Sequence, residues 1–150
     1  MRCSSASRSR SGFSDRVRSS VAIVGILETA LYARDLDAAE DFYARVLGLE
    51  VESKEPGRHL FLRCGGGMVL VFDPEATVRS TGPVPPHGAT GAVHVAFAVD
   101  DLAAWPQRLR AAGVDVEADL EWPNGGRSIY IRDPAGNSIE LTTPRIWLSP

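Results

Sequence analysis

The sequence predicts an α+β fold made of two tandem modules, each a strand, a helix and three further strands arranged in a mixed sheet. One observation is a repeat, in which residues 28–51 and 94–116 share a strand, an acidic residue with leucine, an alanine-rich helix and a glycine. A second is the match between "GRHLFLR" (57–63) and "GRSIYIR" (126–132), each followed by a turn and a last strand. The chain is therefore expected to be a duplication of one βαβββ unit.

Residues typical of helix ends lie at both ends of the first predicted helix. Asp35 and Asp37 suit a helix N-terminus, where carboxylates accept hydrogen bonds from free backbone N–H groups. Gly48 suits the C-terminus, where the chain needs a residue that accepts positive φ. Spacing of i, i+3 and i+4 predicts one buried helix face, formed by Ala39, Tyr43, Val46 and Leu47.

The second module follows the same order with different local chemistry. Pro106 is tolerated only in the first turn of a helix, so this helix is expected to begin near Ala104. Gly113 ends it, as Gly48 ends the first helix. "DPAGN" (133–137) predicts a turn, because proline presets φ and glycine or asparagine accepts positive φ.

One folded domain, residues 21–150, is expected behind a short tail. Its parts are module one at about 23–78, a linker at about 79–90 and module two at about 91–146. Residues 1–20 hold five arginines and one aspartate with little apolar periodicity, which predicts a disordered basic tail. The arginine- and serine-rich composition is also that of a transit peptide, which stays open as an alternative.

Bulk composition excludes several classes of partner. The net charge of -3 and the pI of about 5.6 give no sign of binding to nucleic acid or to an anionic membrane. No apolar run approaches the roughly 18 residues of a membrane span. Cys3 and Cys64 lie far apart, so neither a disulfide framework nor a thiolate metal cluster is indicated, and a cytoplasmic location is expected.

Strand alternation places three potential metal ligands on the concave sheet face, opposite the helix. In residues 93–99 the bulky apolar side chains point one way, towards the helix, and His94 points the other way with two alanines. The same alternation puts Glu28 and Glu140 on the corresponding concave face. Small neighbouring side chains leave room above all three residues.

One imidazole and two carboxylates suit a divalent transition metal, and a shell of three ligands leaves positions for water and substrate. Carboxylates grouped on strands without a metal need another partner, so a salt-bridge cluster with Arg63 or Arg132 is the alternative. The counterpart of Glu140 in the first module is Val71, or Leu70 if one residue is gapped. Either residue is apolar and cannot act as a ligand.

The stretches "YARDLDAAEDFYARVLGLEV", "HVAFAVDDL" and "YIRDPAGNSIEL" resemble the vicinal oxygen chelate superfamily, which includes glyoxalase I, bleomycin-resistance proteins and extradiol dioxygenases. The resemblance covers roughly residues 23–146. It implies paired βαβββ modules that form an open barrel around a metal cleft, commonly in homodimers. The family's ligand positions fall on Glu28, His94 and Glu140, for a divalent ion such as Zn, Ni, Mn or Fe. Glu28 departs from the family, which most often has histidine or glutamine there.

The resemblance implies a lyase, isomerase or related enzyme that acts on a small oxygen-chelating substrate through Lewis-acid catalysis. Glu140 and Glu28 are the catalytic candidates, Glu140 as a ligand and Glu28 as a ligand or a general base. Four residues are expected to contact substrate, the last of them on a mobile rim: His59, Phe61, Tyr130 and Trp122. For Phe61 and Tyr130 a position in the hydrophobic core is the alternative.

Two other functions stay open at this point. One is a protein that binds and sequesters a small molecule without turnover, as bleomycin-resistance proteins do. The other is an extradiol-type dioxygenase, which the residues favour less because two histidines and one carboxylate are not found. The four-ligand pattern of the family's lyases is also incomplete.

Overall fold

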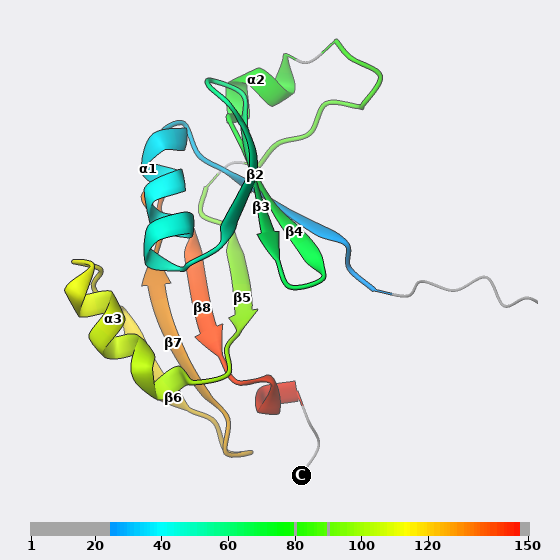
Figure 1. The fold of residues 1–150 in the computed structure, drawn as a ribbon. Helices are drawn as coiled ribbons and strands as arrows, with labels where there is room; N and C mark the ends of the chain where they lie inside the picture. Colours follow the sequence, from blue (N-terminus) through cyan, green and yellow to red (C-terminus); the bar gives the residue numbers. More distant parts are fainter. Residues whose placement is uncertain (1–24, 80, 90, 148–150) are drawn as a thin grey trace, which may run out of the picture.

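Each module forms one four-stranded mixed sheet. The computed structural model describes residues 25–79, 81–89 and 91–147, so the predicted tail lies outside the described residues (Figure 1). The first sheet has the order β1-β4-β3-β2, in which β1 runs parallel to β4 and the other neighbours are antiparallel. Its strands are β1 (Glu28–Tyr32), β2 (Glu50–Glu55), β3 (His59–Cys64) and β4 (Gly67–Phe72).

The second sheet repeats this topology in the order β5-β8-β7-β6, again with its first and last strands parallel. Its strands are β5 (His94–Ala98), β6 (Ala118–Glu121), β7 (Arg127–Arg132) and β8 (Ser138–Thr142). The predicted fold of two tandem βαβββ modules is confirmed. Within the described ranges both sheets are open.

Strand register identifies which residues of the two modules correspond. Ala30 of β1 pairs with Leu70 of β4, as Ala96 of β5 pairs with Glu140 of β8. The two alanines are equivalent in the repeat. Glu140 therefore corresponds to Leu70, the gapped alternative, and not to Val71.

The first helix begins and ends as the sequence predicts. α1 (Leu36–Glu40) continues as a π-helical segment (Asp41–Val46). The Asp35 carboxylate accepts hydrogen bonds from two backbone N–H groups of the first turn, and Gly48 has a φ of 82°. All four residues of the predicted stripe are buried: Ala39, Tyr43, Val46 and Leu47.

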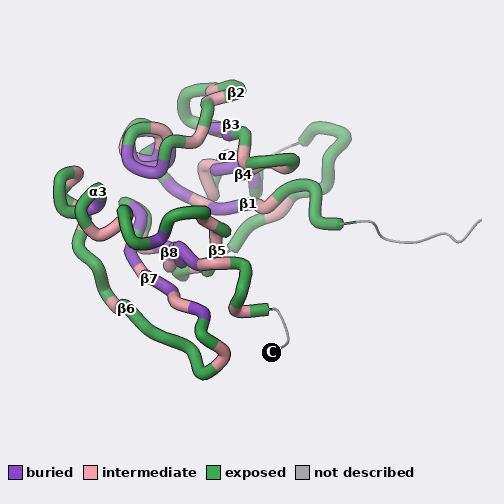
Figure 2. Tube along the Cα trace, turned by 60° about the horizontal axis from the view of Figure 1, so that its bottom comes forward, coloured by how far each residue is buried: buried purple, intermediate pink, exposed green. Residues whose placement is uncertain are grey.

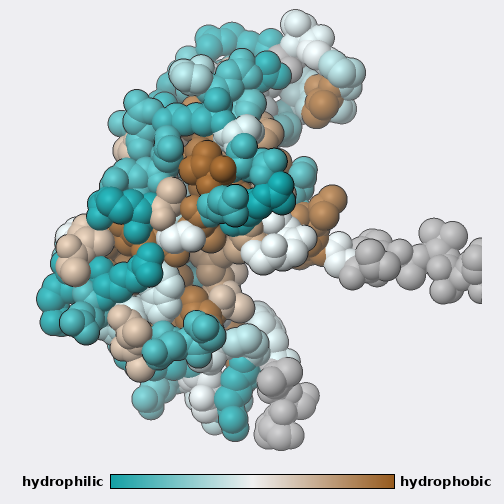
Figure 3. All heavy atoms as spheres, viewed as in Figure 1, coloured by the Kyte–Doolittle hydropathy of each residue, from teal (hydrophilic) through white to brown (hydrophobic). Residues whose placement is uncertain are grey.

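The second helix starts with a 3₁₀ turn (Leu102–Ala104) and continues as α3 (Trp105–Ala111), with its proline in the first turn as expected. α1 and α3 lie on the same side of the sheets (Figure 1), and the buried segments of both modules meet in one core (Figure 2). Apolar atoms are exposed where the described chain begins, at Ile26 and Leu27 (Figure 3). No helix in the described ranges combines the length and apolar character needed to cross a membrane.

Two short helical elements were not predicted. α2 (Pro74–Val78) follows β4, where the Asp73 carboxylate accepts from two backbone N–H groups and Pro74 occupies the first turn. The "DPEA" stretch carries this capping signal. The other is a 3₁₀ turn (Pro144–Trp147) after β8.

A buried carboxylate ties the two modules together. Asp133, in the predicted turn, accepts hydrogen bonds from the Tyr43 hydroxyl at 2.7 Å and from the backbone and side-chain amides of Asn137, both at 2.8 Å. The Asn137 side chain also donates to the backbone carbonyl of Tyr32 at 3.3 Å. Burial and the nearby Asp133 charge raise the pKa of Tyr43, so its hydroxyl stays protonated and can donate.

A close backbone approach at Gly67 sets the entry to β1, and this predicts a selective effect of substitution. A Cβ on Gly67 would lie 2.8 Å from the Leu27 carbonyl oxygen, whereas a Cβ on Gly66 would meet nothing within 4 Å. We expect Gly67→Ala to lower the free energy of unfolding by about 1–3 kcal/mol, because backbone must shift. Gly66→Ala should change it by less than about 0.5 kcal/mol. Urea denaturation of both variants checks this, and equal losses would contradict it.

Candidate active site

The second module gathers three functional side chains on the sheet face away from the helices. The Nε2 atom of His94 on β5 lies 3.3 Å from Oε2 of Glu140 on β8. The His94 side chain is 51% exposed and that of Glu140 only 7%, so the carboxylate forms the floor under an accessible imidazole. The Tyr130 ring lies 6.2 Å from the His94 ring. Burial, and to a lesser extent the nearby Glu140 charge, raises the pKa of Tyr130.

Hydrogen bonds from the protein hold the other side of the Glu140 carboxylate. Oε1 of Glu140 accepts from the hydroxyl of Ser128 on β7, and this hydroxyl accepts at 2.8 Å from the indole Nε1–H of Trp122. Sequence reasoning missed Ser128, although it lies two residues before Tyr130 and alternation gives the two residues the same face. Contact of Trp122 and Tyr130 with a substrate stays a prediction.

The first module presents an aromatic cleft of about 680 Å³ in the corresponding place. The rings of His59 and Phe61 stack at 4.0 Å, and Phe61 meets Phe72 edge to face at 5.5 Å. Desolvation lowers the pKa of His59, which favours its neutral form. Glu28 and Leu70 also line this cleft. Both substrate-contact residues predicted on β3 therefore face a cavity.

Glu28 does not join His94 and Glu140 within one chain. Among the described residues, no three histidine, cysteine, aspartate or glutamate side chains lie close enough together to hold a metal ion. The cleft that Glu28 lines is formed by residues of the first module and the linker. The predicted faces are right for each sheet, but equivalent positions in two separate sheets are not neighbours in space.

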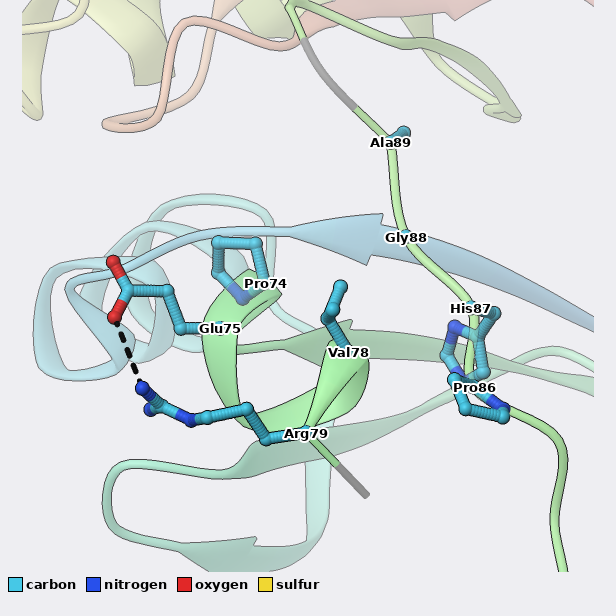
Figure 4. Close-up of a pocket in the computed structure, with 8 residues that line it drawn as sticks. All are labelled: Pro74, Glu75, Val78, Arg79, Pro86, His87, Gly88 and Ala89. Atoms are coloured by element: carbon cyan, nitrogen blue, oxygen red, sulfur yellow. Dashed lines mark ion pairs between the residues drawn. The ribbon is translucent and has the colours of Figure 1, made fainter. Parts of the chain in front are cut away.

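The linker supplies a residue that the sequence did not indicate. Nδ1 of His87, in the proline- and glycine-rich linker, lies 2.8 Å from the Tyr32 hydroxyl, and the His87 ring packs edge-on against Phe72. A second hollow of about 830 Å³ lies on its other side, between α2 and residues 86–89 (Figure 4). In Figure 4 this hollow has a rim formed by Glu75 and Arg79, which lie 3.6 Å apart as an ion pair.

The alternative of a salt-bridge cluster is wrong for the arginines that were considered. Arg63 pairs with Glu52 at 2.5 Å and Arg132 pairs with Glu117 at 2.8 Å. Both guanidinium groups are thus held near the ends of β3 and β7 by other carboxylates. The carboxylate of Glu140 is instead hydrogen-bonded by a neutral hydroxyl, so its charge is available to a cation.

The geometry of the His94 and Glu140 pair fits two ligands of one divalent ion. Ligand bonds of about 2.0–2.2 Å at tetrahedral or octahedral angles put neighbouring donor atoms about 3.0–3.5 Å apart. The observed 3.3 Å between Nε2 and Oε2 lies in this range. An imidazole with carboxylates suits several first-row metals, so the donor set does not select one ion.

Comparisons with known proteins agree with the fold and its two modules. Residues 25–141 match the model of the Glyoxalase/Bleomycin resistance protein/Dioxygenase superfamily. A crystal structure of lactoylglutathione lyase from Agrobacterium tumefaciens is 48% identical and superposes with a TM-score of 0.80, covering 83% of this chain and 97% of that one. A probable lactoylglutathione lyase of Vibrio parahaemolyticus is 31% identical over 128 residues, which span 77% of this chain and 88% of the relative. Lactoylglutathione lyase of Escherichia coli O157:H7 is 29% identical, over 77% and 90%. With its fold, its paired modules and these relatives, the chain belongs to the Glyoxalase/Bleomycin resistance protein/Dioxygenase superfamily.

Proposed function

We propose that the protein is a metal-dependent lyase or isomerase that acts on a small substrate with two chelating oxygens. The observation that carries the proposal is the 3.3 Å pairing of His94 with the buried carboxylate of Glu140. The named relatives make lactoylglutathione the first substrate to test. When bound, the ion would supply Lewis-acid stabilisation of negative charge that develops on substrate oxygen.

The buried and the exposed residues of the site would have different roles. Glu140, whose side chain is buried, would bind the ion together with His94 and keep the positions of these two ligands fixed. Glu28 is exposed and shows no hydrogen-bonded partner that would anchor it among the described residues, so its carboxylate is free to move. It would act as a third ligand or as the base that takes a proton from the substrate carbon beside the carbonyl. Tyr130, protonated at neutral pH, would donate a hydrogen bond at the edge of the site.

A second copy of the chain would complete the site. Glu28 lies in the first module and the other two ligands lie in the second, with separate clefts. The half-exposed His94 and the neighbouring exposed Ala96 and Ala98 leave the second face open to a partner. A two-fold dimer that lays the first module of one copy over the second module of the other forms two equal sites. The exposed apolar residues at the start of β1 would be covered in such a dimer.

Metal analysis of the purified protein tests this function. We expect about one divalent ion per chain after exposure to Zn²⁺, Ni²⁺, Mn²⁺ or Fe²⁺, together with consumption of lactoylglutathione. His94→Ala and Glu140→Ala should lose both the ion and the turnover. His87→Ala replaces a histidine outside the proposed ligand set and should keep the ion. Wild-type protein that binds none of these ions would refute the metal function.

A second candidate function is binding of a small molecule without turnover. The aromatic cleft of the first module favours it, because stacked rings and Leu70 suit a flat apolar ligand better than a metal. Binding of a ligand with equal affinity in the wild type and in Glu140→Ala, without product formation, would select this function over the enzyme.

A further inference from the structure

Glu140 is the only member of the proposed ligand set whose side chain is almost fully buried, and its two oxygens have different partners. Oε2 faces His94 at 3.3 Å, whereas Oε1 accepts from the Ser128 hydroxyl. Ser128 itself is completely buried. The Ser128 hydroxyl therefore contributes to the orientation of the carboxylate, and this orientation leaves Oε2 on the side where an ion would bind.

The direction of the hydrogen bonds follows from the donors available. An indole N–H can only donate, so Trp122 must fill a lone pair of Ser128. Thr142 Oγ1 lies 3.0 Å from Ser128 but donates its own proton to the backbone carbonyl of Arg127, also at 3.0 Å. Thr142 Oγ1 is thus a second acceptor for the single Ser128 proton, but the charged carboxylate of Glu140 is the stronger acceptor and takes this proton. The chain of hydrogen bonds runs from Trp122 through Ser128 to Glu140.

Hydrogen bonds in the turn at residues 122–126 position Trp122 for this contact. Its backbone N–H donates to the Gly126 carbonyl at 2.7 Å, and the Asn124 side chain donates to the carbonyl of Ile146 at 3.0 Å. A Cβ on Gly126 would lie 2.4 Å from Ile146, so the hairpin and the C-terminal 3₁₀ turn are packed without spare space. Trp122 is 38% exposed at the rim, which makes it a support that reaches from the surface to the buried carboxylate.

The first module serves as an internal comparison. It has the same strand register, but the positions that correspond to Ser128, Glu140 and Thr142 hold His59, Leu70 and Phe72. The shared backbone evidently folds without these hydroxyl groups. The polar set is found in the module that carries the carboxylate, so we infer a role towards that carboxylate rather than towards the fold.

We propose that Trp122 and Ser128 are positioning residues, which fix the Glu140 carboxylate so that Oε2 is presented beside His94. This inference rests on the proposed metal function. Residues that orient metal ligands commonly change metal affinity by about 10–100-fold when they are removed. Trp122→Phe keeps an aromatic side chain but replaces the indole by a phenyl ring without an N–H, and Ser128→Ala removes the hydroxyl, so both variants interrupt the chain of hydrogen bonds.

Calorimetric titration with Ni²⁺ and with Zn²⁺ tests the proposal. We expect Trp122→Phe and Ser128→Ala each to weaken the affinity for the ion by about 10-fold or more. Thermal unfolding of Trp122→Phe should stay close to that of the wild type. Trp147→Phe is the matched control, because Trp147 is 86% exposed, and it should leave the affinity unchanged.

A second measurement needs no metal. The protein has three tryptophans, so its amide NMR spectrum holds three indole N–H signals, and Trp122→Phe assigns one of them. Glu140→Gln should shift the Trp122 signal and leave those of Trp105 and Trp147 in place. A Trp122 signal that does not move, with wild-type ion affinity in both variants, overturns the positioning role and leaves the metal function intact. If Glu140→Gln shifts the Trp122 signal but the wild-type protein binds no ion, the metal function is overturned and the hydrogen-bond chain is supported.

Discussion

Glu28→Ala and His94→Ala are each expected to be inactive alone and to recover activity when their chains are combined in one dimer. Each substitution removes a proposed ligand or base, and we expect turnover to fall by about 10²–10³-fold or more. In a mixed dimer one of the two sites takes Glu28 from the His94→Ala chain and His94 from the Glu28→Ala chain, so it is intact. Random pairing of equal amounts should restore about a quarter of wild-type activity.

The control pair is His94→Ala with Glu140→Ala, which are substitutions in the same half of the site. No mixed dimer of these two variants contains an intact site, so their mixture should stay inactive. Co-expression with two different tags isolates the mixed dimers, and sedimentation confirms their mass. Stable mixed dimers of the first pair without activity would refute the shared site.

Asp133→Ala is expected to cause the largest loss of stability, about 3–5 kcal/mol of unfolding free energy. The substitution removes the acceptor for the Tyr43 hydroxyl and for two amides of Asn137, all of them buried. It leaves these donors without partners in an apolar interior, where each costs about 1–3 kcal/mol. Chemical denaturation followed by circular dichroism measures the change.

Asp119→Ala is the matched control for this prediction. Asp119 accepts two hydrogen bonds from Arg127, at 2.6 Å and 2.7 Å, but both residues of this pair are partly exposed. Solvent and salt screen such a pair, so the loss should stay below about 1 kcal/mol. Equal losses for the two aspartates would contradict a special role for the buried network.

Most of the fold could be predicted because the duplication gives each pattern twice. The alternation around His94 and the capping by Asp35 depend on neighbours within a few residues, and the structure has both as expected. The closeness of His94 and Glu140 was also predictable, since their strands carry equivalent patterns and one face is polar. Local periodicity is enough for features of this kind.

Contacts between distant segments could not be predicted. The separation of Glu28 from His94 depends on how the two sheets are placed, and alternation within a strand carries no information about that. His87 reaches Tyr32 across 55 residues of sequence, through a loop with no periodic pattern. Trp122 meets Ser128 through a hairpin whose geometry is determined by packing against the C-terminal turn.

In the described chain, strands pair only with strands of the same module, and this has a consequence for the folding kinetics. Each sheet forms from contacts within about half of the chain, so neither sheet has to wait for the other, and the loops to be closed stay short. The Tyr43 to Asp133 bond joins residues of different modules and can form only after both have folded. We therefore expect the network to be absent from the folding transition state, so that Asp133→Ala accelerates unfolding and leaves the refolding rate almost unchanged.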